Sequence, residues 1–361
     1  MKEKIKLYVR GIRQETADTI TLHFSQPEQK LNYTSGQYLT LISEINGKEV
    51  RRAYSICSSP YTDNNLSVAV KRIKGGNMSN HLHENIVVGD ELFVLPPMGN
   101  FTFKPDNISK HIVLIGGGSG ITPLFSIIKS ALVKEPDSKV SLIYVNSSLE
   151  STIYYEELEQ WHFDFSSGFR IIHHWSDEMK EKQPQRSFFS SLFKKSSPNA
   201  HRIDATRLQT IFRDLHISKE KNTVFYVCGP LQLMEMAVNT IRKIGFSKDV
   251  ILKESFYTSE KVKNASTHST QEHQIKILFK GKEHPVKVKA GTPILFAGLE
   301  AGVNLSYSCQ SGNCTTCVGR CVSGEVEMST IEGLTNQQLN DGYILTCVGY
   351  PKSDDVVIEF K

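Results

Sequence analysis

The feature that most constrains this chain is a group of cysteines near its C-terminal end. The stretch SCQSGNCTTCVGRC, residues 308–321, holds four of the seven cysteines. Cys309, Cys314 and Cys317 follow the spacing C-x4-C-x2-C, and twenty-nine residues separate Cys317 from Cys347. That spacing is the plant-type arrangement for a [2Fe-2S] cluster, whereas structural zinc sites usually show paired C-x2-C units. We therefore predict that these four cysteines ligate a [2Fe-2S] cluster.

The redox compartment decides whether these thiols could instead form disulfides. The N-terminal stretch MKEKIKLYVRGIRQE has no apolar segment long enough for a signal peptide, and the chain has no run of about eighteen apolar residues. We therefore expect a cytoplasmic protein with reduced thiols, which disfavours disulfides. Cys321 lies just beyond the motif. We interpret it as a small buried residue on the strand that leaves the loop, and not as a ligand.

Length and charge narrow the class of protein. A chain of 361 residues exceeds one ordinary core and predicts two or three domains. With 39% hydrophobic and 22% charged residues, the composition is that of a soluble globular protein. The net charge of +4 is too small and too dispersed to favour nucleic acid. Residues 309–361 contain three basic and seven acidic residues, a net charge of −4, which would suit a basic partner.

Three patterns of hydrophobicity divide the chain. Residues 1–105 contain short alternating segments broken by Gly, Asn and Pro, which predicts an antiparallel β-barrel. Residues 106–257 alternate apolar strands with apolar-periodic helices, which predicts a doubly wound α/β domain with a parallel sheet. We expect an inserted loop at about 176–200 and a flexible linker at 258–272. As a coil, the polar stretch 258–274 would span roughly 20 to 25 Å. The strands expected in the barrel are IKLYVRGI, TITLHF, QYLTLIS, AYSIC, LSVAVKRI and ELFVLPP.

The cysteine motif lies within a third unit, residues 273–361. This segment resembles a plant-type ferredoxin: QIKILFKGKEHPVKVKAG indicates a hairpin, TPILFAGLEAGV a helix, and EFK a closing strand. The resemblance implies an α+β domain of the β-grasp type. The expected fold is therefore multidomain, with a barrel, an α/β domain and a ferredoxin domain.

A second motif lies in the predicted barrel. The segment RRAYSICSS contains the pattern R-x-Y-S-x-x-S, formed by Arg52, Tyr54, Ser55 and Ser58. The following strand LSVAVKRI leads into GGNMSNHL, where Gly75, Gly76 and Ser79 are placed to open a helix. The free N–H groups of such a helix can receive a pyrophosphate. An anion would then meet both an arginine and a helix N-terminus.

Together these motifs resemble the ferredoxin-NADP reductase superfamily over residues 1–257. The resemblance implies bound FAD, with Arg52, Met78 and Ser79 at the diphosphate, Tyr54 against the isoalloxazine ring and Ser55 near its N5 edge. The segment PPMGNF, residues 96–101, resembles the family's turn between its two domains. FMN reductases with a C-terminal ferredoxin are an alternative, but their phosphate loop differs, which favours FAD. The residues expected to bind FAD are Arg52, Tyr54, Ser55, Ser58, Gly76, Met78, Ser79 and Phe256.

Two further segments indicate a nicotinamide nucleotide site. IGGGSGITP is a glycine turn between a buried strand and a helix, where glycines permit close approach of a pyrophosphate. VCGP ends a later strand that we expect at the same sheet edge. Both resemble the superfamily's NAD(P)H motifs, which implies that Thr122 and Cys228 lie near the nicotinamide. The residues expected there are Gly116, Gly117, Gly118, Ser119, Gly120, Thr122, Pro123, Cys228, Gly229 and Pro230.

The segment LKESF, residues 252–256, resembles the part of the family that returns to the flavin. The resemblance implies that Glu254 lies near the point of hydride transfer and Phe256 beside the ring. Many relatives carry arginine where this chain has Ser255. The expected catalytic residues are Ser55, Cys228 and Glu254.

The choice between NADPH and NADH depends on the loop after KVSLIYV. That loop reads NSSLES, with no acidic residue directly after the strand to hold a ribose 2′-hydroxyl. Ser147 and Ser148 stand where related NADPH enzymes often carry an arginine, and Arg202 resembles a second basic position of those enzymes that could reach a 2′-phosphate. We therefore predict NADPH, with NADH as the alternative.

Three redox centres in one chain indicate an electron-transfer enzyme. Nicotinamide delivers two electrons as hydride, flavin holds one or two, and a plant-type cluster passes single electrons at about −400 mV. The order of domains resembles the reductase components of multicomponent oxygenases, most closely those of phenylacetyl-CoA epoxidases. The expected partner is an oxygenase or another protein electron acceptor. Alternatives are a fatty-acyl desaturase, a demethylase or a hybrid-cluster protein as acceptor, or a non-enzymatic redox sensor.

Overall fold

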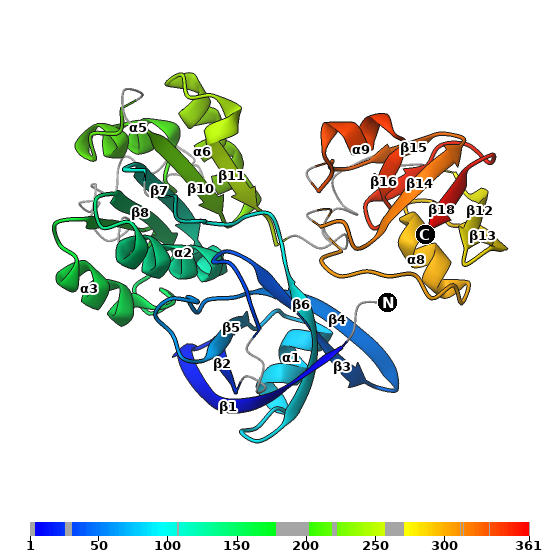
Figure 1. Ribbon diagram of the computed structural model, residues 1–361, viewed down its shortest axis with the longest axis horizontal. Coiled ribbons are helices and arrows are strands. Elements are labelled where there is room, and N and C mark those ends of the chain that lie inside the picture. Colours follow the sequence, from blue (N-terminus) through cyan, green and yellow to red (C-terminus); the bar gives the residue numbers. More distant parts are fainter. Residues whose placement is uncertain are drawn as a thin grey trace, which may run out of the picture.

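The computed structural model has three bodies, each built around its own sheet (Figure 1). It describes residues 4–25, 31–106, 108–177, 202–218, 222–256, 271–310, 312, 314–331 and 333–360. The expected insertion at 176–200 and the expected linker at 258–272 lie almost entirely outside the described residues. Within the described residues, no helix is long and apolar enough to cross a membrane.

The N-terminal body is an antiparallel barrel, as predicted. Its strand order is β4-β3-β6-β1-β2-β5, and an isolated bridge between Ile56 and Val68 joins the two ends of that order. Fully buried Leu7, Leu22 and Leu41 belong to the core that the strands enclose, and helix α1 packs against β3, β4 and β5. The elements are β1 (Ile5–Thr16), β2 (Thr19–Ser25), β3 (Tyr38–Ile45), β4 (Lys48–Ser55), β5 (Leu66–Lys71), α1 (Asn77–Glu84) and β6 (Glu91–Met98).

Strand β4 differs from the expected AYSIC segment. It begins at Lys48, five residues before Ala53, and ends at Ser55. The reason is a tight turn: Asn46 and Gly47 both have positive φ, 52° and 69°, which suits the two-residue hairpin that joins β3 to β4.

The central body is a parallel five-stranded sheet in the order β11-β10-β7-β8-β9. From β7 the chain adds β8 and β9 on one side, then crosses over to add β10 and β11 on the other. The order therefore reverses between β7 and β10, where α/β proteins bind ligands. The elements are β7 (His111–Gly117), a 3-10 turn (Gly118–Gly120), α2 (Ile121–Lys134), β8 (Lys139–Asn146), α3 (Tyr155–Asp164), β9 (Phe169–Trp175), α5 (Ala205–Asp214), β10 (Thr223–Cys228), α6 (Leu231–Lys243) and β11 (Ile251–Glu254).

The C-terminal body is a mixed sheet in the order β13-β12-β18-β14-β16 with a second, two-stranded sheet. The predicted hairpin is β12 with β13, and the closing strand β18 pairs in parallel with β12. Apolar residues of α8, including Ile294 and Leu295, are fully buried against this sheet. The elements are β12 (His273–Phe279), β13 (Lys282–Val288), α8 (Ile294–Glu300), β14 (Val318–Ser323), β15 (Val326–Met328), α9 (Asn336–Asn340), β16 (Tyr343–Leu345), β17 (Gly349–Pro351) and β18 (Val357–Phe360).

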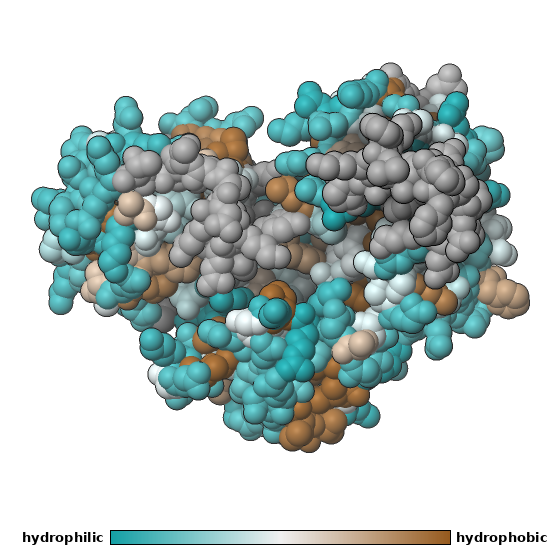
Figure 2. All heavy atoms as spheres, turned by 180° about the vertical axis from the view of Figure 1, so that it is seen from behind, coloured by the Kyte–Doolittle hydropathy of each residue, from teal (hydrophilic) through white to brown (hydrophobic). Residues whose placement is uncertain are grey.

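The face of the molecule shown in Figure 2 is largely hydrophilic. A hydrophobic patch lies at the bottom of the view, on the barrel, and smaller hydrophobic areas are scattered over the rest of the face. Exposed apolar side chains of the barrel are Tyr8, Ile12, Tyr61, Ile73, Val87, Val88 and Phe93. Apolar clusters also connect the bodies: Cys57 and Ala69 of the barrel pack with residues of the α/β body, and Cys314 packs with barrel residues. These contacts between bodies determine the candidate site.

Candidate redox site

The carboxyl ends of three parallel strands bring predicted residues into one row. Gly116 at the end of β7 lies opposite Cys228 at the end of β10, and Cys228 lies opposite Glu254 at the end of β11. This row is at the point where the strand order reverses. The sequence motifs IGGGSGITP, VCGP and LKESF therefore meet at one sheet edge.

The glycines of this edge allow two loops to approach closely. A Cβ on Gly120 would lie 2.2 Å from the carbonyl oxygen of Cys228, and one on Gly229 would lie 2.9 Å from the backbone nitrogen of Gly117. Gly118 has a φ of 52°, which favours glycine. A side chain at Gly120 or Gly229 would force the loops apart. These glycines thus have a packing role in addition to any contact with a nucleotide.

Helix α2 begins directly behind this glycine turn. Thr122 donates from its Oγ1 to the carbonyl oxygen of Ser119 at 3.0 Å, and Pro123 lies in the first turn, where a missing N–H costs nothing. Pro230, at the start of α6, packs against Gly117. The helix N-terminus therefore faces the row with backbone N–H groups, as a pyrophosphate site requires.

A hydrogen bond connects the barrel to this row. Ser55, the last residue of β4, donates from Oγ to Oε2 of Glu254 at 3.0 Å, and both residues are buried. Burial raises the pKa of Glu254 to about 8, a rise that the Ser55 hydrogen bond opposes and nearby Cys309 increases. Burial also raises the pKa of Cys228 well above its usual value. At neutral pH, Glu254 is therefore mainly a neutral carboxyl and Cys228 a thiol.

The residues expected to bind FAD divide between β4 and α1. Arg52 and Tyr54 lie on β4, and Met78 and Ser79 lie in the first turn of α1, which packs against β4. Gly76 is the N-cap of α1 and supplies no side-chain cap, which leaves N–H groups of the first turn for an anion. The arrangement thus fits a diphosphate.

Three expected ligand residues have protein contacts in this structure. Arg52 donates from Nη1 to the carbonyl oxygen of Arg51 at 2.8 Å and to Oε1 of Gln310 at 3.1 Å. The Ser58 hydroxyl accepts from the backbone N–H of Ser67 at 3.0 Å. Ser79 accepts from the N–H of Ile73 at 3.1 Å. Ser58 therefore has a structural role in the barrel.

The cysteine loop brings the four predicted ligands together. Cys314, Cys317 and Cys347 are buried and Cys309 is partly buried, and no disulfide joins any of these four described residues. Cys309 raises the pKa of Cys314 by hydrogen bonding, and Cys347 lowers the pKa of Cys317 in the same way, so the sulfurs face one another.

In the described part of the chain, no three His, Cys, Asp or Glu side chains converge on a single ion. A [2Fe-2S] site does not require this, because the four cysteines are shared between two irons. Four facing, unbridged thiols therefore fit that group. Cys321 lies on β14, the strand that leaves the loop, as predicted, but it is only partly buried.

The cysteine loop docks on the barrel beside the flavin motif. The Thr40 and Ser308 hydroxyls are hydrogen-bonded, and Arg51 stacks over the ring of Tyr307 at 5.0 Å. Cys314 packs in an apolar cluster with Tyr38 and other barrel residues. These contacts join residues far apart in the sequence, and no short sequence pattern predicts them. They bring the cysteine site, Ser55 and Glu254 to one junction.

The residues expected to select the nucleotide lie in separate local contacts. Ser147 is exposed, and the N–H of Ser148 donates to Oγ of Ser151 at 3.0 Å. Arg202 is exposed and donates to Oε1 of Gln232 at 2.5 Å. Phe256 follows β11 and is 41% exposed. The preference for NADPH therefore stays a prediction.

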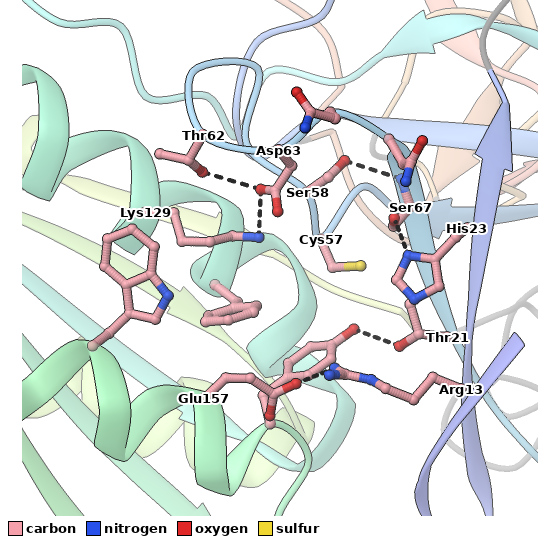
Figure 3. A pocket seen from close by; sticks show the side chains of 15 residues that line it. Arg13, Thr21, His23, Cys57, Ser58, Thr62, Asp63, Ser67, Lys129 and Glu157 are labelled. Atoms are coloured by element: carbon pink, nitrogen blue, oxygen red, sulfur yellow. Dashed lines mark hydrogen bonds and ion pairs between the residues drawn. The ribbon is translucent and has the colours of Figure 1, made fainter. Parts of the chain in front are cut away.

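A cavity of about 440 Å³ lies elsewhere on the seam between barrel and α/β body (Figure 3). Of the predicted site residues, only Ser58 lines it. Its charged side chains are paired: Lys129 with Asp63 at 2.7 Å, and Arg13 with Glu157. The cavity lacks Ser55, Cys228 and Glu254, so we do not assign it to the redox site.

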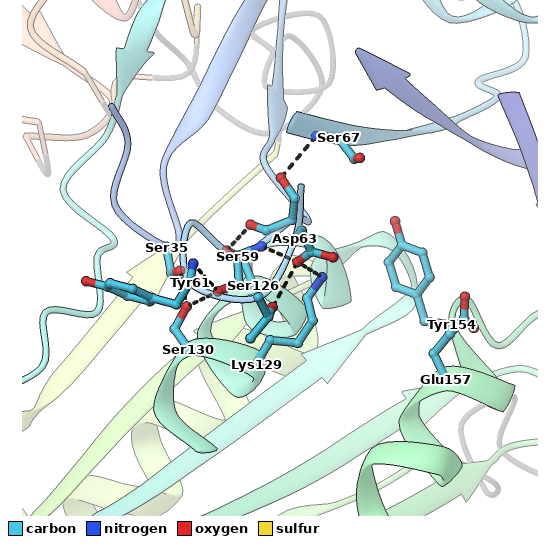
Figure 4. Close-up of polar contacts among 12 residues, drawn as sticks. Ser35, Ser59, Tyr61, Asp63, Ser67, Ser126, Lys129, Ser130, Tyr154 and Glu157 are labelled. Carbon is cyan, nitrogen blue, oxygen red and sulfur yellow. Dashed lines mark hydrogen bonds and ion pairs between the residues drawn. The ribbon is translucent and has the colours of Figure 1, made fainter. Parts of the chain in front are cut away.

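Beside this cavity, polar contacts hold α2 against the barrel (Figure 4). Ser126 donates to the carbonyl oxygen of Ser58 at 2.6 Å, and Ser130 is hydrogen-bonded to Ser59 at 2.8 Å. These contacts fix the helix whose N-terminus faces the nucleotide edge. They thereby position that edge relative to Ser55.

Comparison with known proteins agrees with this architecture. Three family models match: Oxidoreductase FAD-binding domain over residues 6–103, Oxidoreductase NAD-binding domain over 114–239, and 2Fe-2S iron-sulfur cluster binding domain over 277–352. The solved structure of phthalate dioxygenase reductase has a TM-score of 0.62 at 22% identity, covering 99% of this chain and 98% of that one. The predicted fold class is therefore confirmed. The fold and the matched models define an electron-transfer oxidoreductase with FAD-binding, NAD-binding and 2Fe-2S domains.

Full-length relatives identify the family. A component of the 1,2-phenylacetyl-CoA epoxidase of Escherichia coli strain K12 is 31% identical over 98% of this chain and 97% of its own length. The 3-ketosteroid-9-alpha-monooxygenase, ferredoxin reductase component, of Rhodococcus rhodochrous is 30% identical over 98% of this chain and 96% of its own. The chain belongs to the reductase-component family that contains these proteins, within the ferredoxin-NADP reductase superfamily.

Proposed function

We propose that this protein oxidises NADPH and passes electrons through FAD and a [2Fe-2S] cluster to an oxygenase. The observation that carries the proposal is the junction where Ser55, Glu254 and the cysteine loop meet. Bound flavin would accept an electron pair as hydride and release electrons singly to the cluster. A short path between the two groups requires that their sites adjoin.

The chain's residues divide the work. Gly116–Gly120 and the start of α2 bind the nucleotide diphosphate, while Cys228 and Glu254 border the nicotinamide. Ser55 and Glu254 form a neutral hydrogen-bonded pair beside the flavin edge, which allows a proton to be held there without a buried charge. Arg52 and the α1 N-terminus bind the FAD diphosphate. Cys309, Cys314, Cys317 and Cys347 ligate the cluster.

The nucleotide is NADPH in this proposal. Ser147 and Ser148 supply hydroxyl groups where an acidic residue would favour NADH. Arg202 is an exposed guanidinium that can exchange its contact with Gln232 for a 2′-phosphate.

The acceptor in this proposal is a di-iron oxygenase of the phenylacetyl-CoA epoxidase type. Full-length similarity to the 1,2-phenylacetyl-CoA epoxidase component supports that choice. The ferredoxin domain, 273–361, carries the exported electrons, and the acidic excess of its last 53 residues suits a basic docking surface. The FAD domain spans 1–105 and the nucleotide domain 106–257, with the linker at 258–272.

An anaerobic titration of the reconstituted full-length protein tests the electron path. Complete reduction requires two electrons for FAD and one for the cluster, or about 1.5 equivalents of NADPH per chain. Flavin bleaching and the signal of the reduced cluster should both saturate at that ratio. Flavin bleaching without cluster reduction would contradict the proposed path.

The acceptor is tested separately, with purified oxygenase components, NADPH and phenylacetyl-CoA. Epoxide formation that depends on this reductase supports the proposed partner. Turnover with a Rieske oxygenase alone would reassign the acceptor. No turnover with any acceptor protein, despite full cluster reduction, would favour a redox sensor.

A further inference from the structure

Tyr38 of the barrel is buried at the contact with the cysteine loop. It is the first residue of β3, is 4% exposed, and belongs to the apolar cluster that contains Cys314. Gly99, just after β6, fixes the ring from one side, because a Cβ there would lie 3.2 Å from two ring carbons of Tyr38. The position of the ring is therefore determined by the barrel itself.

The hydroxyl of Tyr38 has an unusual environment. It is buried, and within the described residues it makes no hydrogen bond of normal geometry. It lies against the thiol of Cys314, with Cys309 and Ser308 nearby. Burying a hydroxyl without a hydrogen-bond partner destabilises the folded protein, so a buried hydroxyl normally faces an acceptor. The groups it faces here are the Cys314 sulfur and the Ser308 hydroxyl, and Ser308 is already hydrogen-bonded to Thr40.

We infer that the FAD domain donates a hydrogen bond from Tyr38 across the domain boundary to a sulfur on the Cys314 side of the [2Fe-2S] site. This inference rests on the proposed function, because it requires that the cysteine loop holds the cluster. It adds a residue from outside the ferredoxin domain to the surroundings of the cluster. Thr40 with Ser308 and Arg52 with Gln310 hold the two domains in register for this contact.

Such a hydrogen bond makes the reduction potential of the cluster depend on docking. Reduction adds one electron to the cluster, and a hydrogen bond to sulfur stabilises the more negative, reduced form. One electron leaves the flavin and one arrives at the cluster, while the hydroxyl proton stays on Tyr38. The docked cluster is therefore the better electron acceptor. A ferredoxin domain bound to its partner lacks the bond and is the better donor.

The test is an EPR-monitored redox titration of the full-length, FAD-loaded protein and its Tyr38→Phe variant. Phenylalanine keeps the ring packing and removes only the hydroxyl. In the variant, we expect the equilibrium constant for electron transfer from the flavin to the cluster to be about tenfold smaller. For a one-electron couple this corresponds to a cluster midpoint potential lower by about 59 mV than in the parent. Cluster and FAD contents should be unchanged. Tyr8→Phe, at a 46% exposed position of β1, is the matched control and should titrate like the parent.

A second measurement covers the case in which Tyr38→Phe loses the cluster. Hyperfine spectra of the reduced parent protein should show an exchangeable hydroxyl proton coupled to the cluster, which disappears in D2O. The absence of that coupling, or identical midpoints in parent and variant, would overturn the inference. A parent protein that assembles no cluster would instead overturn the proposed function.

Discussion

The carboxyl of Glu254 offers a quantitative test of the junction, through the substitution Glu254→Gln. Glutamine preserves the shape of the side chain and can accept from Ser55, but it has no charge to bury. The parent carboxyl has its pKa raised from 4.5 to about 8, primarily by burial. A shift of this size corresponds to a preference of about 5 kcal/mol for the neutral form in the folded protein.

The sign of the resulting pH dependence follows from proton binding. Between pH 4.5 and about 8 the folded protein keeps a proton that the unfolded chain has lost. The contribution of Glu254 to stability is therefore fully present below pH 4.5 and is lost as pH rises through about 8. The loss amounts to about 1.4 kcal/mol per pH unit in that window. Glu254→Gln abolishes this slope because the amide does not titrate.

The assay is urea unfolding of parent and variant at several pH values. From about pH 5.5 to about pH 7.5, the difference in unfolding free energy between variant and parent should change by about 3 kcal/mol in favour of the variant. Glu300→Gln, at an exposed position of α8, is the control and should follow the parent. Parallel curves for Glu254→Gln and parent across this range would refute the burial of a neutral carboxyl at the junction.

Three further predictions concern the cofactors. Cys→Ser substitution at each predicted ligand should abolish the cluster in iron and sulfide analysis, whereas Cys321→Ser should keep it; the opposite pattern at Cys321 and Cys347 would show that the ligand set is wrong. Arg52→Ala and Tyr54→Ala should each weaken FAD binding by about 1 to 3 kcal/mol in equilibrium titrations. Gln310→Asn is the control: the shorter side chain removes the contact with Arg52, asparagine accepts the φ of 56° at this position, and the variant should retain FAD. Unchanged FAD affinity in both alanine variants would count against the site. The parent should have a higher kcat/KM for NADPH than for NADH, and Arg202→Ala should reduce that preference about tenfold; a parent that prefers NADH would reverse the assignment.

Features predicted from the sequence are those fixed by local patterns. The spacing of Cys309, Cys314 and Cys317 and the glycine turn at 116–120 each occupy one short segment. Their chemistry follows from residue type and spacing alone. The parallel sheet was also predictable, because alternating strands and helices constrain strand direction and place Cys228 at the same edge as Gly116. The start of β4 was missed although the pair Asn46-Gly47 is a strong hairpin signal.

Features missed by the sequence analysis depend on how folded domains meet. Arg52 and Gln310 are 258 positions apart, and neither lies in a pattern that indicates the other. The same holds for Tyr38, whose role at the cysteine loop depends on the position of a whole domain. An arginine in R-x-Y-S indicates an anion, but its second contact with the ferredoxin domain appears only in the structure. Long-range contacts of this kind have no one-segment signal.

The central claim is that electrons leave through the ferredoxin domain, and a fragment ending near Ser259 tests it most directly. The quantity to measure is cytochrome c reduction relative to ferricyanide reduction, with NADPH as donor, in the fragment and in the full-length protein. The fragment keeps the row Gly116, Cys228 and Glu254, so it should bind FAD, oxidise NADPH and reduce ferricyanide, a small acceptor. It should lose cytochrome c reduction, because the cysteine loop is absent. Cytochrome c reduction by the fragment at the full-length rate would contradict the account.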